Sequence, residues 1–299
     1  MDTIENKKIY ALGFFDGVHS GHQALLAACR KLAAENGGLA GVVTFTSHPD
    51  ALVSGTAPML LNDPEDRRRL LKSFGISQIV ELPFDRQLME MSWRDFIRML
   101  RSKPYCAAGF VCGIDFRFGH MGQGTAQILS NYCTAAGMPH AVVPQQEKNG
   151  IRISSTHIRQ LIEAGQLEKA TDFLGHPHIL SGTVISGRKL GRTIGIPTAN
   201  IRIPEGVVLP PRGVYACRVQ VDAASYLAVT NIGSRPTVGG HHITVEPWIL
   251  DFSGDLYGKT ITLEFHTFLR PEQKFGSLEE LQAEIQKNAL QTRNFFEKT

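Results

Sequence analysis

The sequence lacks any long hydrophobic run. No window of its 299 residues approaches the roughly 18 consecutive apolar residues of a membrane span, and its start, MDTIENKK, lacks the apolar core of a secretory signal. Charge of one sign is also scarce, because the formal net charge is only +3. The one tight basic run, Arg67-Arg68-Arg69, follows acidic residues and predicts a solvated helix face. These absences argue against membrane and nucleic-acid partners and predict a cytoplasmic protein.

Cysteine is sparse as well. The five cysteines are odd in number and scattered, without the C-x-x-C pairing of zinc or redox sites, so we expect buried or incidental thiols. Internal repeats and low-complexity segments are also absent. A 299-residue chain exceeds the usual size of one hydrophobic core, so two domains are expected.

The first part of the chain alternates strand-like runs with helical periods. The predicted strands are residues 9–15, 39–45, 77–84, 107–114 and 140–144, and the predicted helices are residues 22–35, 64–74, 92–102 and 125–137. Strands separated by helices indicate an α/β domain, with a mostly parallel sheet covered on both faces.

The pattern changes after about residue 180. Short apolar and β-branched runs alternate with glycine and proline, and the next helical pattern, residues 278–291, comes near the C-terminus. This half predicts a small antiparallel β-barrel with a C-terminal helix. We therefore expect domains at residues 1–177 and 178–299.

The segment GFFDGVHSGH, residues 13–22, joins the first predicted strand to the first helix. Glycines allow the backbone to come close to a ligand, and the free N–H groups of a helix start favour an anion, so this loop is suited to phosphate. His19 and His22 are three residues apart and can donate hydrogen bonds to one phosphate group. Two alternatives remain at this point: a zinc site, for which no third ligand is evident nearby, and a plain tight turn.

A second segment, ISSTHIR at residues 153–159, places three hydroxyls and an arginine at another predicted helix start. Ser154 or Ser155 can cap that helix, and capping and phosphate binding use the same free N–H groups. Arg159 adds a charged donor that a cap does not need.

With these two segments and GIDFRFG at residues 113–119, the sequence resembles the HIGH-type, Rossmann-like nucleotidyltransferase module of bacterial bifunctional riboflavin kinase/FMN adenylyltransferases, the FAD synthetases. The resemblance implies that the FMN phosphate attacks the α-phosphorus of ATP and that pyrophosphate leaves. It also implies Asp115 and Arg117 at the flavin and nucleotide crevice. The residues implied to bind ATP phosphates in this module are Gly13, Phe14, His19, His22, Ser155, Thr156 and Arg159.

The second half contains its own glycine-rich loop, residues 187–200, which ends in PTAN. Such a loop alone predicts a hairpin turn with solvated charges. Thr198 and Asn200 alternate along a strand, so their side chains face one way and offer two neutral oxygen ligands to Mg²⁺. A later segment, residues 254–260, resembles a Walker A loop, but it is one residue short between its glycines and leads into a strand, so we reject that interpretation.

Four segments together resemble the riboflavin kinase module: GRTIGIPTAN, TNIGSRPT, VEPWILDF and FLRPEQKF, which begin at residues 191, 230, 245 and 268. The resemblance therefore covers nearly the whole chain. It implies a six-stranded barrel in which Glu246 is the general base on the riboflavin 5′-hydroxyl and Arg270 lies near the flavin. For Mg-ATP it implies Gly187, Gly191, Thr198 and Asn200, with Thr198 and Asn200 at the metal.

The sequence departs from this pattern in places. Pro247 and Trp248 follow Glu246 where the family usually has Thr-His or Val-His, and a proline there predicts an edge or bulged strand. His48 and Pro49 remain of the usual F-x-P-H-P segment. Asn288 replaces a frequent aspartate, a change that we expect to affect packing more than chemistry.

The expected function is a two-step synthesis of FAD from riboflavin, through FMN, with ATP and Mg²⁺. Glu246, His19, His22 and Arg159 are the candidate catalytic residues. One alternative is an FMN adenylyltransferase whose barrel only binds flavin, and another is a flavin-sensing module without either activity.

Overall fold

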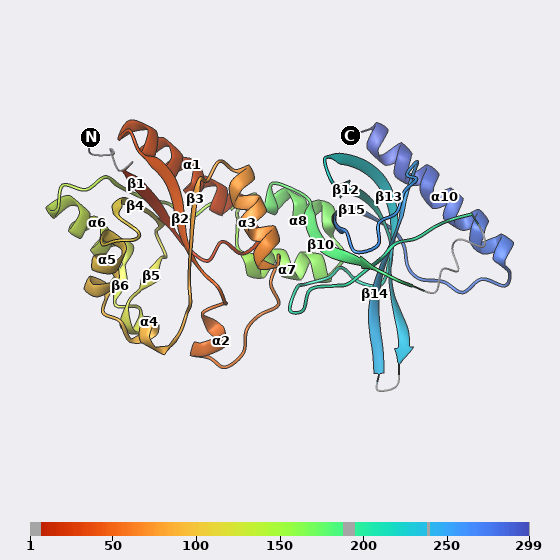
Figure 1. Ribbon diagram of the computed structural model, residues 1–299, viewed down its shortest axis with the longest axis horizontal. Coiled ribbons are helices and arrows are strands. Elements are labelled where there is room, and N and C mark those ends of the chain that lie inside the picture. Colours follow the sequence, from red (N-terminus) through yellow and green to blue (C-terminus); the bar gives the residue numbers. More distant parts are fainter. Residues whose placement is uncertain (1–6, 188–194, 238–239, 299) are drawn as a thin grey trace. The chain divides into compact units, whose positions relative to one another are not determined.

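The computed structural model describes residues 7–187, 195–237 and 240–298, without the side chains of residues 235–242. Gly191, implied above to bind ATP, lies outside these described residues. The chain divides into two compact units, whose elements are labelled in Figure 1. The first unit contains Met1–Met59 and Arg67–Ser155, and the second contains Leu60–Asp66 and Thr156–Thr299. A domain boundary after residue 177 stays a prediction.

A parallel five-stranded sheet forms the centre of the first unit. Its strand order is β3-β2-β1-β4-β7, and every neighbouring pair is parallel. The predicted α/β sheet is therefore confirmed. The strands are β1 (Lys8–Leu12), β2 (Leu39–Phe45), β3 (Gln78–Leu82), β4 (Ala107–Gly113) and β7 (His140–Val143).

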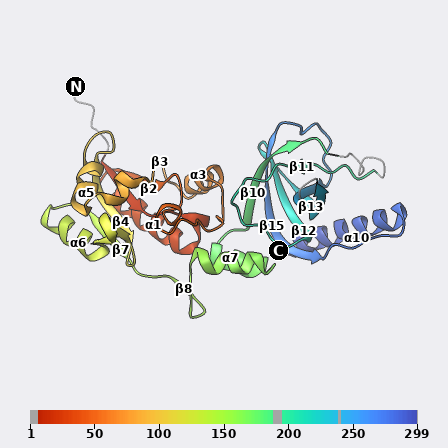
Figure 2. The ribbon, with the colours of Figure 1, turned by 90° about the horizontal axis from the view of Figure 1, so that it is seen from below.

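Helices and short hairpins complete the N-terminal half of the chain. The helices are α1 (Ser20–Glu35), α2 (Asp50–Val53), α3 (Pro64–Ser73), α4 (Arg86–Glu90), α5 (Trp93–Arg101) and α6 (Ala126–Ala135), with 3-10 turns η1 (Asp16–Val18) and η2 (His120–Gly122). One hairpin pairs β5 (Arg117–Phe118) with β6 (Gly124–Thr125), and another pairs β8 (Glu147–Lys148) with β9 (Ile151–Arg152). Figure 2 shows the β8 hairpin projecting away from the sheet.

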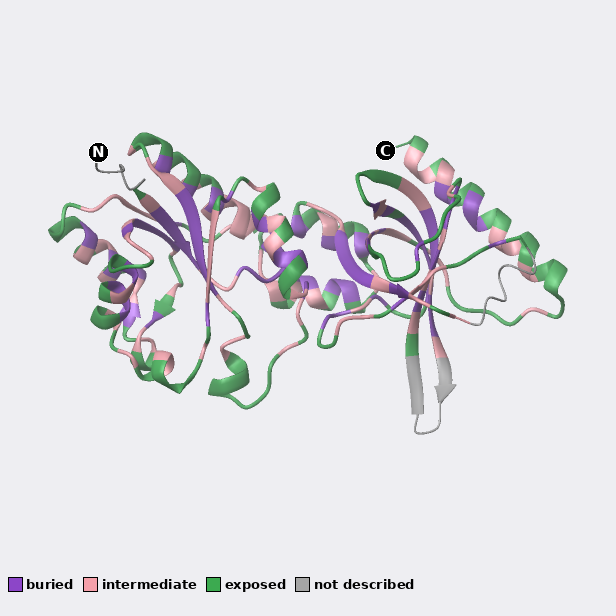
Figure 3. Ribbon diagram, viewed as in Figure 1, coloured by how far each residue is buried: buried purple, intermediate pink, exposed green. Residues whose placement is uncertain are grey.

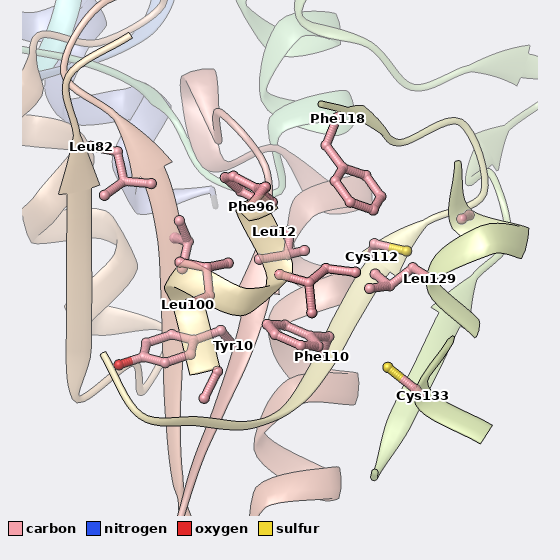
Figure 4. Close-up of a cluster of buried hydrophobic side chains, with 14 residues drawn as sticks. Tyr10, Leu12, Leu82, Phe96, Leu100, Phe110, Cys112, Phe118, Leu129 and Cys133 are labelled. Carbon is pink, nitrogen blue, oxygen red and sulfur yellow. The ribbon is translucent and has the colours of Figure 1, made fainter. Parts of the chain in front are cut away.

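The sheet buries both of its faces, because successive residues of a strand point to opposite sides. On one face Ile9 belongs to a hydrophobic cluster with Leu26 of α1. On the other face Tyr10 belongs to a second cluster with Phe96 of α5 and Leu129 of α6 (Figure 4). Each fully buried apolar side chain stabilises the fold by about 1.5–3 kcal/mol. The packing of helices on both faces therefore stabilises the sheet and fixes the positions of its strand ends.

The second unit is built around a closed antiparallel barrel with the strand order β10-β11-β14-β13-β12-β15. The predicted barrel and its terminal helix are confirmed, and Figure 3 shows that buried residues line its strands. The strands are β10 (His178–Ile185), β11 (Asn200–Ile201), β12 (Gly213–Val221), β13 (Ala224–Thr237), β14 (Gly240–Ile249) and β15 (Thr260–Arg270).

Within the residues that the structure describes, the helices of this part of the chain are α7 (Ser155–Glu163), α8 (Leu167–Leu174) and α10 (Leu278–Glu297). Helix α10 starts at Ser277, whose hydroxyl accepts a hydrogen bond from the Glu280 N–H at 3.2 Å, and it packs against β12 and β13. Among the helices of the described residues, none is long and apolar enough to cross a membrane.

The prediction of an edge or bulged strand at Pro247 is wrong. Strand β14 lies between β13 and β11, and its register with β13 runs without a shift through the pair of Pro247 and Thr230. The Pro247 carbonyl accepts a hydrogen bond from the Ala199 N–H at 2.9 Å. Since the nitrogen and carbonyl of one strand residue point to the same side, the missing N–H faces Ala199, directly before the short strand β11. The proline therefore costs β13 no ladder hydrogen bond.

Candidate active sites

The loop after β1 has a strained backbone held by buried side chains. Phe15 has φ +59°, Gly17 has φ +76° and Val18 has φ +39°. A positive φ is a marked outlier for a β-branched residue such as Val18. Phe15 and Val18 are both fully buried, so core packing compensates for the strain. The loop is therefore preformed, as a phosphate site requires.

His19 and His22 lie against each other at the start of α1. The imidazole rings are stacked, with centroids 3.7 Å apart and planes 14° apart. His19 caps the helix, because its Nδ1 accepts a hydrogen bond from the His22 N–H at 3.3 Å. A Cβ atom on Gly21 would lie 3.2 Å from the His19 ring, so a glycine at this position makes room for the imidazole.

His22 is held as a neutral imidazole. Burial lowers the pKa of His22 well below its ordinary value, and the neighbouring His19 lowers it further. The Nδ1 atom of His22 is buried without a hydrogen-bond partner among the described residues. A buried polar atom of this kind costs free energy unless a ligand or water satisfies it.

A cavity of about 210 Å³ lies in the first unit, next to these histidines. It is bordered by the segments that follow β1, β4 and β7, and β1 and β4 flank the point where the strand order of the sheet reverses. Ligands of open α/β sheets bind at such a point, outside the carboxyl ends of the strands. The cavity brings together four predicted site residues: Gly13, His19, His22 and Asp115.

Some residues at this cavity were missed from the sequence. Gln145 and Gln146 follow β7, and Arg152 lies on β9. Arg152 pairs with Asp115, with 2.9 Å between Nη2 and Oδ2, although both side chains are more than half exposed. The sequence pattern could have predicted Gln145 and Gln146, because they follow a predicted parallel strand and the carboxyl ends of such strands meet at one edge of the sheet. Arg117, the other predicted flavin residue, does not border this cavity.

Phe14 is also placed outside the cavity lining. Its carbonyl accepts hydrogen bonds from Thr44 Oγ1 at 2.9 Å and from Arg67 Nη1 at 3.3 Å, and its ring lies 4.5 Å from the Arg67 guanidinium. His48 contacts the same ring edge-on, with centroids 4.7 Å apart. Phe14 thus anchors the loop from behind, and its contact with ATP stays a prediction.

The solvated face predicted for the arginine run is wrong at Arg67, which is only 2% exposed. Its guanidinium donates to the Phe14 and Phe45 carbonyls and lies 3.7 Å from Glu81. Burial lowers the pKa of Arg67, and the carboxylates of Glu81 and Asp16 oppose that shift. A charge pattern on one helix could not reveal these partners, because they come from other elements.

A hydroxyl of the second motif contacts the loop. Ser155 Oγ donates to the Asp16 carbonyl at 3.1 Å, so this residue supports the strained turn. Thr156 and Arg159 belong to the second compact unit, where Arg159 Nη1 lies 3.5 Å from Thr156 Oγ1. Their approach to ATP stays a prediction.

A larger cavity, of about 490 Å³, lies in the barrel unit. It brings together the predicted residues Thr198, Glu246 and Arg270. Asn231 lies directly opposite Glu246 in the β13–β14 register, and both border the cavity. Apolar side chains form much of the remaining wall: Ile196, Val214, Val229, Trp248, Phe275, Leu278, Leu281 and Ile285.

Arg270 is fixed in this cavity by its neighbours. Its Nε donates to Asn288 Oδ1 at 3.0 Å, and Glu284 lies 3.5 Å away. Burial lowers the pKa of Arg270, and Glu284 opposes the shift. Asn288 is 1% exposed and borders the cavity. Its role goes beyond the packing that the sequence predicts, because its side-chain oxygen orients the Arg270 guanidinium.

The PTAN segment has the chemistry of a magnesium site. Thr198 is exposed and borders both the 490 Å³ cavity and an adjoining cavity of about 250 Å³. A Cβ atom on Gly187 would lie 2.3 Å from Asn200 Nδ2, so glycine makes room for this amide. A hydroxyl and an amide oxygen suit Mg²⁺ that also binds phosphates. Within the described residues, no three His, Cys, Asp or Glu side chains are grouped to hold a metal ion.

The adjoining cavity has a wall that the sequence did not predict. Residues 252–257 border it together with Pro197, Thr198 and Ala199. This segment overlaps the rejected Walker A resemblance, and it leads into β15 as expected, not into a helix. The sequence pattern could not predict this role for residues 252–257, because only the closed barrel brings them beside the PTAN segment.

Comparisons with known proteins agree across the chain. A family model described as FAD synthetase matches residues 1–157, and one described as riboflavin kinase matches residues 174–296. A protein of Listeria monocytogenes named bifunctional riboflavin kinase/FMN adenylyltransferase is 36% identical, with 97% of this chain and 93% of the relative covered. A relative of the same name from Escherichia coli K12 is also 36% identical, with 96% and 92% covered.

A solved structure from Streptococcus pneumoniae, named a macrolide-efflux protein, is 31% identical and has a TM-score of 0.85. The alignment covers 98% of this chain and 95% of that one, so both units have counterparts in it.

Proposed function

Because the chain belongs to the family of bifunctional riboflavin kinase/FMN adenylyltransferases, we propose that it makes FAD in two steps. The barrel unit phosphorylates riboflavin to FMN with ATP. The first unit transfers an adenylyl group from a second ATP to FMN and releases pyrophosphate. The observation that carries the proposal is the pair of separate cavities, each bordered by its own set of predicted residues.

In the kinase step Glu246 acts as general base. Glu246 borders the cavity from a regular strand, and its carboxylate accepts the 5′-hydroxyl proton of riboflavin as the oxygen attacks the γ-phosphorus. Arg270 and Asn231 hold the flavin. Thr198 and Asn200 would hold Mg²⁺, which when bound neutralises charge on the ATP phosphates.

The adjoining 250 Å³ cavity suits the nucleotide. It shares Thr198 with the riboflavin cavity, so a molecule on each side would meet at this residue. Such an arrangement aligns acceptor and donor, and alignment alone supplies a large part of phosphoryl-transfer catalysis.

In the adenylyl transfer the protein supplies no covalent intermediate. The FMN phosphate attacks the α-phosphorus of ATP, and His19 and His22 donate hydrogen bonds to the phosphates. A neutral imidazole suits this role, because it carries one N–H donor without a titrating charge. Thr156 and Arg159 complete the phosphate contacts, and Asp115 faces the flavin.

One alternative, an FMN adenylyltransferase whose barrel only binds flavin, is suggested by Pro247 and Trp248 after Glu246. The regular β13–β14 register at that proline, with Glu246 at the cavity, supports an active kinase instead. A flavin-sensing module without activity is the other alternative, and turnover distinguishes it.

The test is a time course with riboflavin and Mg-ATP, in which riboflavin, FMN and FAD are separated chromatographically. We expect FMN to appear first and FAD to follow, with both absent in excess EDTA. FAD from added FMN, but no FMN from riboflavin, would support the single-activity alternative. Flavin binding without either product would support the sensing module.

A further inference from the structure

Trp248 is a large aromatic side chain at the riboflavin cavity to which no role has yet been assigned. It is one of only two tryptophans in the chain, and it stands where the family pattern usually has histidine. Trp248 follows Glu246 by two residues on β14, so both side chains lie on the same face of the strand, and both border the 490 Å³ cavity.

The Trp248 side chain packs against buried residues of the barrel. Trp248 pairs with Val229 on β13 and packs against a buried cluster that also contains Val214 and Leu250. The side chain is half-buried, so part of it is packed and part borders the cavity. These packed neighbours restrict the positions that the indole can adopt.

The chemistry of the cavity changes along its wall. Glu246, Asn231 and Thr198 supply polar groups, whereas Trp248 continues into the apolar wall. The volume of about 490 Å³ falls in the range of ordinary small-molecule sites. A ligand with a polar chain and a flat apolar ring system matches this division.

We propose that Trp248 is a specificity-determining residue of the kinase site, which stacks on the planar ring system of riboflavin and binds it without taking part in phosphoryl transfer. The inference rests on the proposed kinase function. Stacking of a flat heterocycle on an aromatic side chain contributes about 1–3 kcal/mol by alanine substitution. Loss of the indole should therefore weaken riboflavin binding about tenfold or more, since 1.4 kcal/mol is a factor of ten.

The test compares Trp248→Ala and Trp248→Phe with the wild-type chain. We expect Trp248→Ala to raise the Kd and KM for riboflavin about tenfold with kcat nearly unchanged, and Trp248→Phe to recover most of the loss. Trp93→Phe is the matched control, because Trp93 lies in the other unit, and it should change neither constant. The kcat for FMN formation, a reaction of the same barrel unit, reports that each variant is folded.

A spectroscopic readout separates stacking from a structural role. In the Trp93→Phe protein, whose remaining tryptophan is Trp248, riboflavin should quench indole emission strongly and add a long-wavelength shoulder to flavin absorption. Trp248→Phe should lose the shoulder. An unchanged Kd in Trp248→Ala, or a fall in kcat alone, would overturn the inference even if FMN is formed. If the wild-type chain binds riboflavin with these signals but makes no FMN, the kinase proposal fails and the stacking inference stands.

Discussion

The two units provide different frameworks for the phosphates that each is proposed to bind. In the first unit a strained loop leads to two histidines that border a cavity, and buried Phe15 and Val18 compensate for the strain. In the barrel unit Glu246, Asn231 and Thr198 project from or beside regular strands. A loop site thus depends on the packing beneath it, whereas a strand site depends on register. The two should respond differently to substitution.

The largest effect is expected at the barrel site. Glu246→Gln keeps the shape of the side chain but removes the base, so FMN formation should fall about 10²–10⁴-fold, the range of general base catalysis. FAD formation from added FMN should continue at the wild-type rate. Separate assays of the two half-reactions measure this. A loss of both activities in a folded variant would contradict the assignment of the reactions to separate sites.

His22→Ala should act in the opposite unit. Loss of a preorganised donor to transition-state charge typically costs about 10²–10³-fold in rate, so FAD formation should fall by that amount while FMN formation persists. His22→Asn, which keeps a donor, should recover part of the rate. Equal rates in the alanine variant and the wild-type chain would remove His22 from the mechanism.

A pH experiment tests a buried histidine of the barrel unit, His178. Burial lowers the pKa of His178 to about 4, and its ring nitrogen Nε2 lies 3.2 Å from the Val208 carbonyl. Below the unfolded pKa of about 6.5 the unfolded chain binds a proton that the folded barrel does not, so stability falls as pH falls. Between pH 7 and 5 the loss from this group should be on the order of 1–2 kcal/mol.

Urea unfolding in the Trp93→Phe background reports on the barrel unit through Trp248. His178→Gln has no proton to gain in this range, so its stability should change less between pH 7 and 5. An equal pH dependence in both proteins would show that other groups dominate.

Gly21→Ala should cause a smaller, local effect. The added Cβ would lie 3.2 Å from the His19 ring, so the imidazole must shift by a few tenths of an ångström. We expect FAD formation to fall about tenfold or less, because catalysis is sensitive to alignment. FMN formation should not change. Gly37→Ala, at a glycine with φ +64° and no neighbour within 4 Å of the added atom, should lower stability through backbone strain but leave FAD formation unchanged.

The smallest effect on stability is expected at Asp115 and Arg152. Both side chains are exposed, and surface ion pairs contribute about 0–1 kcal/mol. Arg152→Ala should leave the urea midpoint nearly unchanged. A rise in the KM for FMN in Asp115→Asn, without a change in stability, would place the flavin at this cavity.

Local patterns predicted most of the elements. The strand at residues 39–45 was predicted with the bounds of β2, and the helix predicted at residues 64–74 agrees with α3 to one residue. The location of the cavity beside His19 and His22 could be predicted from the parallel topology, because the carboxyl ends of parallel strands meet at one edge of the sheet. Arg67 was mispredicted, because one carbonyl partner lies in the loop after β1 and the other at the end of β2, and the pattern of one helix cannot reveal them.

The sequence by itself determined the two fold classes and the motifs of the two proposed phosphate sites, because hydrophobic period and glycine placement act over short distances along the chain. Only the tertiary structure decided that Pro247 fits inside a closed barrel, that Asn288 orients Arg270, and that residues 252–257 border the cavity beside Thr198. These features depend on strand order and register, which bring together residues that are far apart in the chain.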